Sequence, residues 1–376
     1  MATISFIGDI MLGRLVGKKY TDRPYSVVSD ELIQQTATSD LIVANLESPV
    51  AYDATTDGDH LSFKGNPNIL EQLRWIHLFS LSNNHINDCG RNGMDETIAV
   101  LEQKGFKHNG LFKTDYLPYL YEKGEDKIAI ITVTDMINIP FSEDCDWDIL
   151  RLGEKRVIDI LEQYHNSGYC TIVFAHVGML FTRFPNPVTR NYLHQYIDAG
   201  ADIIVTAHSH CLGCMETYKG KHIFHSIGDF IMDGNSYRRR RSAILNLQIT
   251  QGVLHAWELV PAETNDQLET IEPSVKIRQR MLRNFDKVSD LLSKHTSNYT
   301  TYYRYRYKLE MIRHSTSTIL FLWHSRGFFG MLKMIVQRFE EVFRMFHWIS
   351  KDRSNDQRDD DAIRADRKMF KQDDLF

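Results

Sequence analysis

The sequence has no run of about 18 apolar residues, so it predicts no membrane-spanning helix. Its start has no basic segment followed by an apolar core, because Met1–Ile7 runs directly into Gly8 and Asp9, and no secretory signal is expected. Its five cysteines are odd in number and scattered, which is typical of a reducing compartment. We therefore expect a cytoplasmic protein.

An excess of charge of one sign is also missing. The chain has 44 Lys and Arg against 49 Asp and Glu, a net charge of −5, so no general affinity for nucleic acid is expected. Hydrophobic residues make up 43% and charged residues 25% of the 376 positions, which excludes a disordered chain, a collagen-like fibre and a small disulfide scaffold. The length suits one large domain with an appendage, or two domains.

Short apolar runs alternate with amphipathic stretches through residues 2–250, a pattern that predicts a layered α/β domain. The strand-like runs are Ile4–Ile7, Leu41–Ala44, Leu78–Leu81, Ile128–Val133, Thr171–Ala175 and Ile203–Thr206. Helical patterns lie near Ser26–Thr36, Gly93–Lys104, Lys155–His165 and Arg190–Ala199. From about residue 215 the pattern changes to hairpins.

Residue types that bind metal ions follow five of the strand-like runs. They are Asp9 after the first run, Asn45 and Glu47 after the second, Asn84 and His85 after the third, His176 after Thr171–Ala175, and His208 and His210 after Ile203–Ala207. In an open α/β sheet, ligands bind beyond the carboxyl ends of the strands. We therefore expect these side chains to converge on one crevice.

The donor set combines carboxylate and amide oxygens with imidazole nitrogens, which suits manganese, iron or zinc better than calcium. It exceeds what one tetrahedral ion needs, so it favours two divalent ions, or one ion with catalytic side chains beside it. A single histidine after a strand is more often structural. Polar groups at five strand ends of one crevice are costly to bury unless they are used, which favours the metal hypothesis.

The same residues fall within a longer series of motifs. The series is Gly8–Arg14, Asn45–Glu47, Leu81–His85 with Asp88 and Gly90, His176–Gly178, Gly200–Asp202, His208–His210, Glu216 and Ser226–Phe230. In order and spacing it resembles the CapA-type capsule-synthesis family, whose members are linked to poly-γ-glutamate and other capsule polymers. The resemblance covers about residues 2–250. It implies a calcineurin-like metallophosphoesterase fold, an α/β sandwich of two mixed β-sheets flanked by helices.

The sequence departs from that family in several places. Tryptophan is usual at Val177, proline at Ser209, asparagine at Asp229 and an aromatic residue at Cys89, and none of these changes removes a presumed ligand. The wider metallophosphoesterases have a histidine two residues after the first aspartate, where this chain has Met11. One metal position therefore lacks a nitrogen ligand, and the sequence leaves open whether the centre holds one ion or two.

The chemistry of the candidates suggests roles for them. Glu47 can bridge two ions because a carboxylate has two oxygens to share. We expect Asn84, His176 and His208 to complete the metal position that has more ligands, here called the better-furnished position. Asp9 and His210 are expected to serve the position that has fewer ligands, the poorer one. The resemblance implies that His85 is a general acid that protonates the leaving oxygen. Arg14, one turn after Asp9, either holds an anionic group of the substrate or is a solvated helix residue.

Four further residues are expected around this site. Asn45 belongs to the same motif as Glu47. Asp88 either accepts the imidazole proton of His85 or shapes the turn that follows it. Glu216 is expected to orient a ligand histidine. Arg238 begins a run of four arginines that either gathers an anionic substrate or lies on a solvated face.

The organisation predicted for the chain has three parts: a metallophosphoesterase-like domain over 1–260, a C-terminal helical extension over 275–350, and a loosely ordered charged tail over 351–376. Residues 301–350 hold eight Lys or Arg against three Asp or Glu, together with twelve aromatic residues. Within them, Phe328–Trp348 has an apolar stripe at helical spacing. We expect that stripe to pack on the sandwich. Attachment to the inner face of a membrane, or contact with a partner in the capsule machinery, is the alternative.

Together these features predict a metal-dependent hydrolase that acts on a phosphorylated small molecule, another phosphoester, or an anionic polymer intermediate. The alternative is a non-catalytic component of a capsule or exopolymer assembly machinery that retains the fold.

Overall fold

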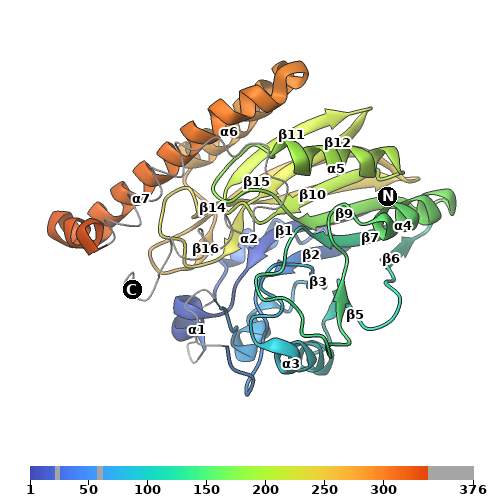
Figure 1. Cartoon of the computed structure of the whole chain (residues 1–376), viewed down its shortest axis with the longest axis horizontal. Coiled ribbons are helices and arrows are strands. Elements are labelled where there is room, and N and C mark those ends of the chain that lie inside the picture. The colour runs from blue at the N-terminus through green and yellow to red at the C-terminus, as the bar shows by residue number, and fades with distance from the viewer. Residues whose placement is uncertain (22–25, 57–61, 338–376) are drawn as a thin grey trace.

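Two β-sheets pack face to face between layers of helices in the computed structural model of the chain (Figure 1). The structure describes residues 1–21, 26–56 and 62–337. The larger sheet has eight strands. Its order is β16 (Thr270–Ile271), β15 (Val253–Thr264), β14 (Arg241–Thr250), β1 (Ala2–Ile10), β2 (Leu41–Leu46), β3 (Leu78–Ser80) and β4 (Lys107–Asn109), and β13 (Asp229–Ile231) also pairs with β1.

The second sheet has six strands, and both sheets are mixed. Its order is β11 (Leu212–Tyr218), β12 (Lys221–Ile227), β10 (Ile203–Ala207), β9 (Cys170–His176), β7 (Asp126–Thr134) and β6 (Tyr119–Lys123). Strand β1 pairs in parallel with β2 and antiparallel with β14, and β9 pairs in parallel with β7 and β10. A small separate sheet joins β5 (Leu111–Phe112) to β8 (Asp148–Ile149).

Alternation along each strand explains why the layers form. In β9, Ile172 and Phe174 belong to the apolar cluster between the two sheets. Val173 and Ala175 belong to a second cluster on the outer face of the six-stranded sheet. Because successive side chains of a strand point to opposite faces, a strand that is apolar at every position must be covered on both sides. The helices supply that second cover.

The helices cover the outer faces of both sheets. On the larger sheet lie α1 (Arg14–Tyr20), α2 (Asp30–Gln34), the 3-10 helix η1 (Pro67–Leu73) and α3 (Gly90–Gln103). On the six-stranded sheet lie α4 (Lys155–Asn166) and α5 (Pro187–Asp198). The predicted α/β sandwich of two mixed sheets flanked by helices is therefore confirmed. Strand β15 continues past residue 260 and β16 follows it, so the sheet extends into the segment where the sequence suggests a boundary.

A C-terminal helical extension follows the sandwich, as expected. Helix α6 (Val275–Lys294) packs against β11 and β15, and η2 (Thr296–Asn298) leads into α7 (Tyr299–Gln337). The two long helices run along the outer side of the sandwich (Figure 1). Tyr299 and Tyr303 of α7 are buried in a cluster with Phe184 and Cys214 of the sandwich. The beginning of α7 is therefore docked through buried apolar contacts.

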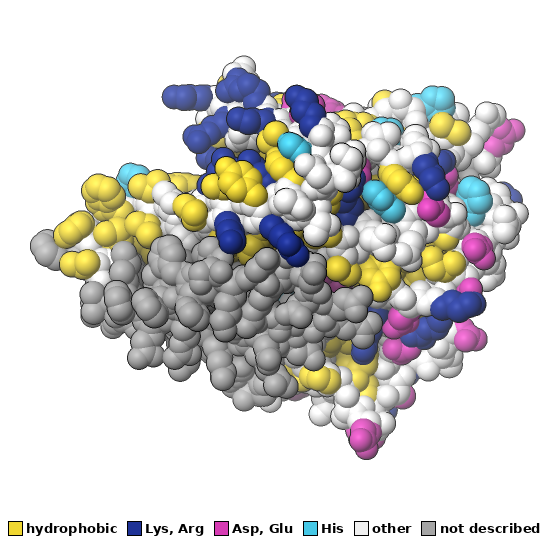
Figure 2. Space-filling model, turned by 45° about the horizontal axis from the view of Figure 1, so that its top comes forward, with side chains coloured by type: hydrophobic (Ala, Val, Ile, Leu, Met, Phe, Trp, Pro, Cys, Tyr) yellow, Lys and Arg dark blue, Asp and Glu magenta, His cyan; other side chains and the backbone are white. Residues whose placement is uncertain are grey.

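At the outer end of α7, the structure describes only the beginning of the stripe that is predicted to pack on the sandwich. Gly327 has φ 70° and interrupts the helix, after which Phe328 and Leu332 are exposed while Met331 is buried against Leu322. Figure 2 shows hydrophobic side chains on this outer end, with Lys and Arg side chains gathered above it. Residues 338–348 of the predicted stripe and the predicted tail 351–376 lie outside the described residues. No helix within the described residues is long and apolar enough to cross a membrane.

Candidate metal centre

The ends of four central strands bring the metal-binding residue types together. The larger sheet supplies Asp9 at the end of β1 and Glu47 directly after β2, and the six-stranded sheet supplies His176 at the end of β9 and His208 directly after β10. All four side chains are buried. The site therefore lies between the two sheets at the carboxyl ends of their parallel strands, where the fold class places ligands.

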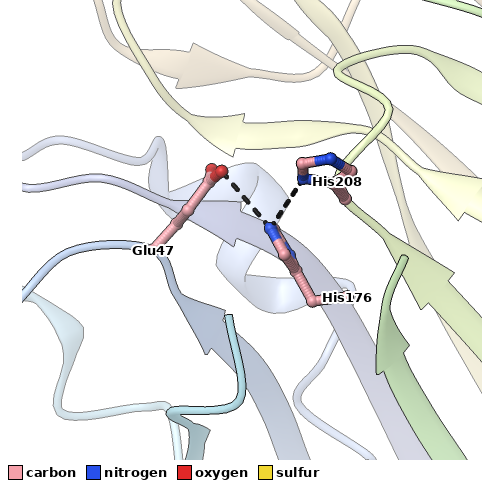
Figure 3. A group of neighbouring side chains, drawn as sticks. All are labelled: Glu47, His176 and His208. Carbon is pink, nitrogen blue, oxygen red and sulfur yellow. Dashed lines mark hydrogen bonds and ion pairs between the residues drawn. The ribbon is translucent and has the colours of Figure 1, made fainter. Parts of the chain in front are cut away.

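Glu47, His176 and His208 form the first of two donor groups, with their ligand atoms all within 4.8 Å of one another (Figure 3). The Nε2 atom of His176 lies 3.0 Å from Nδ1 of His208 and 3.5 Å from Oε1 of Glu47. The Oδ1 atom of Asn84 lies 2.8 Å from the same nitrogen. The structure thus gathers around one point the four side chains expected at the better-furnished position.

Several of these atoms are buried without the partners that burial normally requires. Both carboxylate oxygens of Glu47 lack a hydrogen-bond partner among the described residues, and so does the Nε2 atom of His208. An unpaired buried polar atom costs about 1–3 kcal/mol, and more when it is charged. A divalent cation bound by Glu47 and His208 would satisfy these atoms, so the residues present fit a metal ion.

The protonation states of the histidines follow from their neighbours. Burial opposes the charged form of His176, but the charge and hydrogen bond of Asp9, together with the negative charge of Glu47, raise its pKa to about 10. Burial and the charges of His176 and His210 hold the pKa of His208 well below its usual value. His208 is therefore neutral, as a ligand must be, while His176 carries positive charge where a cation would otherwise balance the carboxylates.

Asp9, His210 and Asp229 form the second donor group, again with ligand atoms within 4.8 Å. Burial would raise the pKa of Asp9, but His176 and hydrogen bonds from His176 and Asn45 hold it below its usual value. The Nδ2 atom of Asn45 donates to Oδ1 of Asp9 over 2.8 Å and lies 3.0 Å from Nδ1 of His176. Asn45 therefore links the two groups, in agreement with its expected place beside the ligands.

Strained backbone holds both histidines of the His208–His210 motif. His208 has φ 97° and His210 has φ 55°, a region that residues other than glycine rarely adopt. The backbone N–H of His208 donates to Oδ2 of Asp9 over 3.0 Å. Such conformations persist only where the surrounding structure fixes them, and they are concentrated at functional sites.

His85 lies next to this site and is held by three neighbours. Its Nδ1 atom is 2.6 Å from Oδ2 of Asp88, and its ring stacks on Phe63 with the centroids 4.0 Å apart. The amide nitrogen of Asn138 lies 3.2 Å from Nδ1 and 3.3 Å from Nε2. Asp88 also accepts from the backbone N–H of Phe63 over 2.6 Å. Of the two roles considered for Asp88, the structure shows the contact with the imidazole, and the second contact of its carboxylate is with the Phe63 backbone rather than with the turn after His85.

Arg14 lies on the Phe63 side of His85. Its guanidinium is 5.2 Å from the centroid of the Phe63 ring, and its Nη2 atom is 3.0 Å from Oδ1 of Asp233. The side chain is largely buried rather than a solvated helix residue. Asp233 therefore balances its charge and fixes its position beside Phe63.

Glu216 is not behind a ligand histidine, and this expectation is corrected. Its carboxylate forms an ion pair with Arg190 and lies 3.0 Å from Nε2 of His194 and 3.1 Å from Nε2 of His225. These groups lower the pKa of Glu216 despite its burial. Neither histidine belongs to the two donor groups. Glu216 instead ties β11 to α5 and β12.

Arg238 is neither on a solvated face nor in contact with the donor groups. Its guanidinium pairs with the buried carboxylate of Glu310 on α7. The next residue, Arg239, lies 3.7 Å from Oδ2 of Asp229 through its Nε atom, and Arg240 pairs with Asp266. The predicted run of arginines is thus divided among separate partners within the chain.

Two residues of the site were not nominated from the sequence. Asp229 was noted only as a departure from the family's asparagine, although a carboxylate at that place is itself a signal of a metal ligand. Asn138 lies in the loop after β7 and is adjacent to His85 through the backbone as well, since its N–H donates to the carbonyl of Asn84 over 2.8 Å. No sequence motif predicts Asn138, because a loop residue comes close to a site only when the whole chain has folded.

The comparisons with known proteins agree with these motifs. Residues 3–234 match the family model described as "Bacterial capsule synthesis protein PGA_cap". The "PGA biosynthesis protein CapA" of Bacillus subtilis is 26% identical over 297 residues, covering 76% of this chain and 78% of that protein. The "Capsule biosynthesis protein CapA" of Bacillus anthracis is 26% identical over 307 residues, covering 76% and 73%.

Among solved structures, the sulfate thiohydrolase SoxB of Thermus thermophilus is similar at a TM-score of 0.43 and 12% identity, covering 79% of this chain and 61% of that chain. The family model spans well over half of the chain and contains every donor residue described above. The chain therefore belongs to the bacterial capsule synthesis protein family PGA_cap.

Proposed function

We propose that the protein is a metal-dependent hydrolase that acts on a phosphoester or an anionic polymer intermediate in capsule or poly-γ-glutamate synthesis. The observation that carries the proposal is the set of buried atoms on Glu47 and His208 that have no hydrogen-bond partner among the described residues. One of them, Oε1 of Glu47, lies 3.5 Å from Nε2 of His176. Relatives named for capsule and PGA biosynthesis support the process. The hydrolytic step is inferred from the chemistry of the site.

The residues that would hold a divalent transition metal are Glu47, Asn84, His176 and His208, with Asp9 and His210 beside them. Manganese, iron and zinc all accept this mixture of oxygen and nitrogen donors. When bound, such an ion lowers the pKa of a coordinated water and polarises an ester oxygen. Asn45 fixes the orientation of Asp9 by donating from its amide nitrogen to Oδ1, and the same nitrogen lies 3.0 Å from Nδ1 of His176.

His85 is suited to the proton transfer that ester cleavage requires. Asp88 fixes one ring nitrogen at 2.6 Å, and stacking on Phe63 fixes the plane of the ring. The other nitrogen, Nε2, lies 3.3 Å from the amide nitrogen of Asn138 and can hold a proton for the leaving oxygen. Arg14, whose guanidinium lies 5.2 Å from the centroid of the Phe63 ring, supplies positive charge for an anionic group of the substrate.

The alternative function is a non-catalytic component of the polymer assembly machinery. It is favoured by Met11, which offers no nitrogen donor. The Met11 sulfur accepts from the backbone N–H of Gly13 over 3.1 Å, and its side chain packs with Phe63 and Met232. A centre with a full set of ligands at only one of its two metal positions could hold a structural ion.

Contact with a membrane surface or with the capsule machinery is proposed for residues 301–350. Within the described part of this segment, Ile312, Ile319, Leu320 and Trp323 are exposed on α7. Figure 2 shows Lys and Arg side chains on the same face of the molecule as the hydrophobic side chains at the outer end of this helix. Exposed apolar residues with cations beside them are typical of interfacial helices. Proximity to anionic lipid would place the site near a growing polymer.

A substrate screen tests the proposed hydrolysis. The purified protein is assayed with phosphomonoesters and phosphodiesters in the presence of manganese, alongside His85→Gln and the exposed-residue control His255→Gln. Loss of a general acid lowers a rate by about 10²–10⁴-fold, so His85→Gln should lose that factor while retaining its metal. A protein that binds metal but turns over no ester would instead support the non-catalytic alternative.

A further inference from the structure

The loop that follows β9 leads from the metal centre to α7. It comprises residues 177–186, and its Phe181 has φ 62°, a conformation that residues other than glycine rarely adopt. The backbone N–H of Phe181 donates to the carbonyl of Ser209 over 2.8 Å. Its ring stacks near His210, with the centroids 5.9 Å apart and the planes at 30°. Phe181 is therefore packed against both the backbone and an imidazole of the His208–His210 motif.

Helix α7 contacts this loop at three places in succession. The contacts join Tyr299 to Pro185, Glu310 to Arg183, and His314 to Phe181. As the loop runs back from residue 185 to 181, α7 runs forward from 299 to 314, so the two segments are antiparallel. The last contact is a parallel stack, in which the ring centroids of His314 and Phe181 are 4.0 Å apart and their planes differ by 9°. The helix thus holds the loop along its length.

Stacking, and not hydrogen bonding, holds the imidazole of His314. The side chain is 5% exposed, and its Nδ1 atom has no hydrogen-bond partner among the described residues. Burial and nearby positive charge, chiefly that of Arg238, hold its pKa well below the usual value, so the ring is neutral. A buried nitrogen without a partner destabilises a fold. The contact that this side chain does make is with the face of Phe181, which makes its flat ring the part that acts.

We propose that His314 is a positioning residue for the metal centre, which acts by stacking on Phe181 and so keeps the loop and His210 in place. Docking of α7 and binding of metal are then coupled, and such a coupling acts equally in both directions. The inference rests on the proposed metal-dependent function. Helix α7 lies outside residues 3–234 that match the family model, so the coupling belongs to the extension of this chain.

A merely structural role for His314 makes a different prediction. If α7 only stabilises the fold, the loss of any buried side chain of the helix lowers stability and leaves the metal affinity of folded protein unchanged. Two variants separate these roles. His314→Phe keeps a flat ring and removes both nitrogens. Leu322→Ala removes a buried side chain that packs with Phe321 and Met331 of its own helix.

The first measurement is calorimetric titration of the metal-stripped full chain with MnCl₂. Residues that orient metal ligands typically contribute about 10–100-fold to metal affinity, so His314→Ala should raise the Kd for manganese by about 10-fold. His314→Phe and Leu322→Ala should bind manganese with the affinity of wild type. Rescue by phenylalanine would identify the stacked ring, and not an imidazole nitrogen, as the group that acts.

The second measurement is hydrogen exchange, which does not depend on activity. In metal-free protein, the amide of Phe181 should exchange faster in His314→Ala than in wild type, because the loop loses its support. In wild type, manganese should slow exchange of the α7 amides at residues 310–314 more than exchange of the α4 amides. This comparison needs no variant, so it decides the question even if His314→Ala does not fold.

Three results would overturn the coupling. One is His314→Ala protein with the manganese affinity and the Phe181 exchange of wild type. Another is equal weakening in His314→Ala and Leu322→Ala without rescue in His314→Phe. The third is wild-type protein that binds manganese without slower exchange in α7. All three leave the proposed function standing, whereas wild-type protein that binds no metal would refute that function together with the coupling.

Discussion

The buried carboxylate of Glu310 offers a sharp test of how α7 is attached to the sandwich. Arg183 binds it with two parallel contacts of 3.0 and 2.9 Å, and Arg238 pairs with it from the loop before β14. From its own helix, Arg313 lies 2.8 Å and Arg306 3.5 Å away. Replacing Glu310 by glutamine keeps the shape but leaves four guanidinium groups around a neutral side chain.

The size of the effect follows from the pKa of Glu310. Burial opposes ionisation, but Arg183 and Arg238 lower the pKa from 4.5 to about 2. At about 1.4 kcal/mol per pH unit, this fall corresponds to about 3 kcal/mol of stability. That value agrees with the roughly 3–5 kcal/mol lost when one partner of a buried ion pair is removed. Because the folded pKa is depressed, the contribution is complete above the unfolded value of 4.5 and is lost as pH falls through about 2.

The assay combines chemical denaturation with hydrogen exchange of the α7 amides at pH 7 and at acid pH. Glu310→Gln should unfold at lower denaturant, and α7 should lose protection before the sheets do. The difference from wild type should narrow as pH falls below about 4.5. Glu258→Gln, an exposed glutamate on β15, is the matched control. Unchanged stability and unchanged α7 protection in Glu310→Gln would refute the view that this carboxylate fastens the helix.

Four further predictions concern the site and the extension. His176→Ala and His208→Ala should lower metal content more than Met11→Ala does, and equal loss in all three on elemental analysis would refute the ligand assignment. Met11→His should strengthen the poorer metal position by calorimetry, and a folded variant with unchanged binding would show that residue 11 does not face the site. Asp135 directly follows β7, and burial raises the pKa of its carboxyl to about 6. Above that pH the buried charge destabilises the fold, so Asp135→Asn should raise the free energy of unfolding of metal-free protein. Below about pH 4 the substitution should change that free energy little. Deletion of 301–376 should cause aggregation by uncovering Phe184 and Cys214, whereas a monodisperse truncation, with salt-sensitive liposome binding by the full chain, would favour an interfacial helix.

The strand ends of the site could be predicted from the sequence because each has two signals, an apolar run and a metal-binding residue type at or directly after its end. The run before His176 is apolar at every position, which predicts a strand covered on both faces, and a polar ligand type follows it immediately. The same holds for Glu47 and His208. Parallel strands of one sheet end at the same edge, and the packing of the two sheets brings the end of β2 next to the ends of β9 and β10.

The partners of single charged side chains could not be predicted in this way. Glu216 and Arg238 stand in motifs next to the site, yet Glu216 pairs with Arg190 of α5 and Arg238 with Glu310 of α7. Both partnerships join elements far apart in the sequence, and their choice depends on how helices dock on the sheets. Periodicity fixes which face of a strand is buried, but it does not identify the charge that lies opposite.

The outer end of α7 illustrates a further limit. The spacing of Phe328 and Leu332 predicts one continuous helix face, but Gly327 breaks the helix just before them. Glycine reaches φ 70° at no steric cost, and the two stripe residues described after it, Phe328 and Leu332, are exposed. Hydrophobic spacing reports amphipathicity, not the surface that an amphipathic segment covers.

The central claim is that Glu47, His176 and His208 hold a divalent transition metal, and the metal content of the purified full chain tests it most directly. The account predicts about one ion or more per chain by elemental analysis, or uptake of manganese or zinc by calorimetry after stripping, with loss of binding in His208→Ala. Protein that is folded, carries no stoichiometric metal and takes up neither ion would contradict the account.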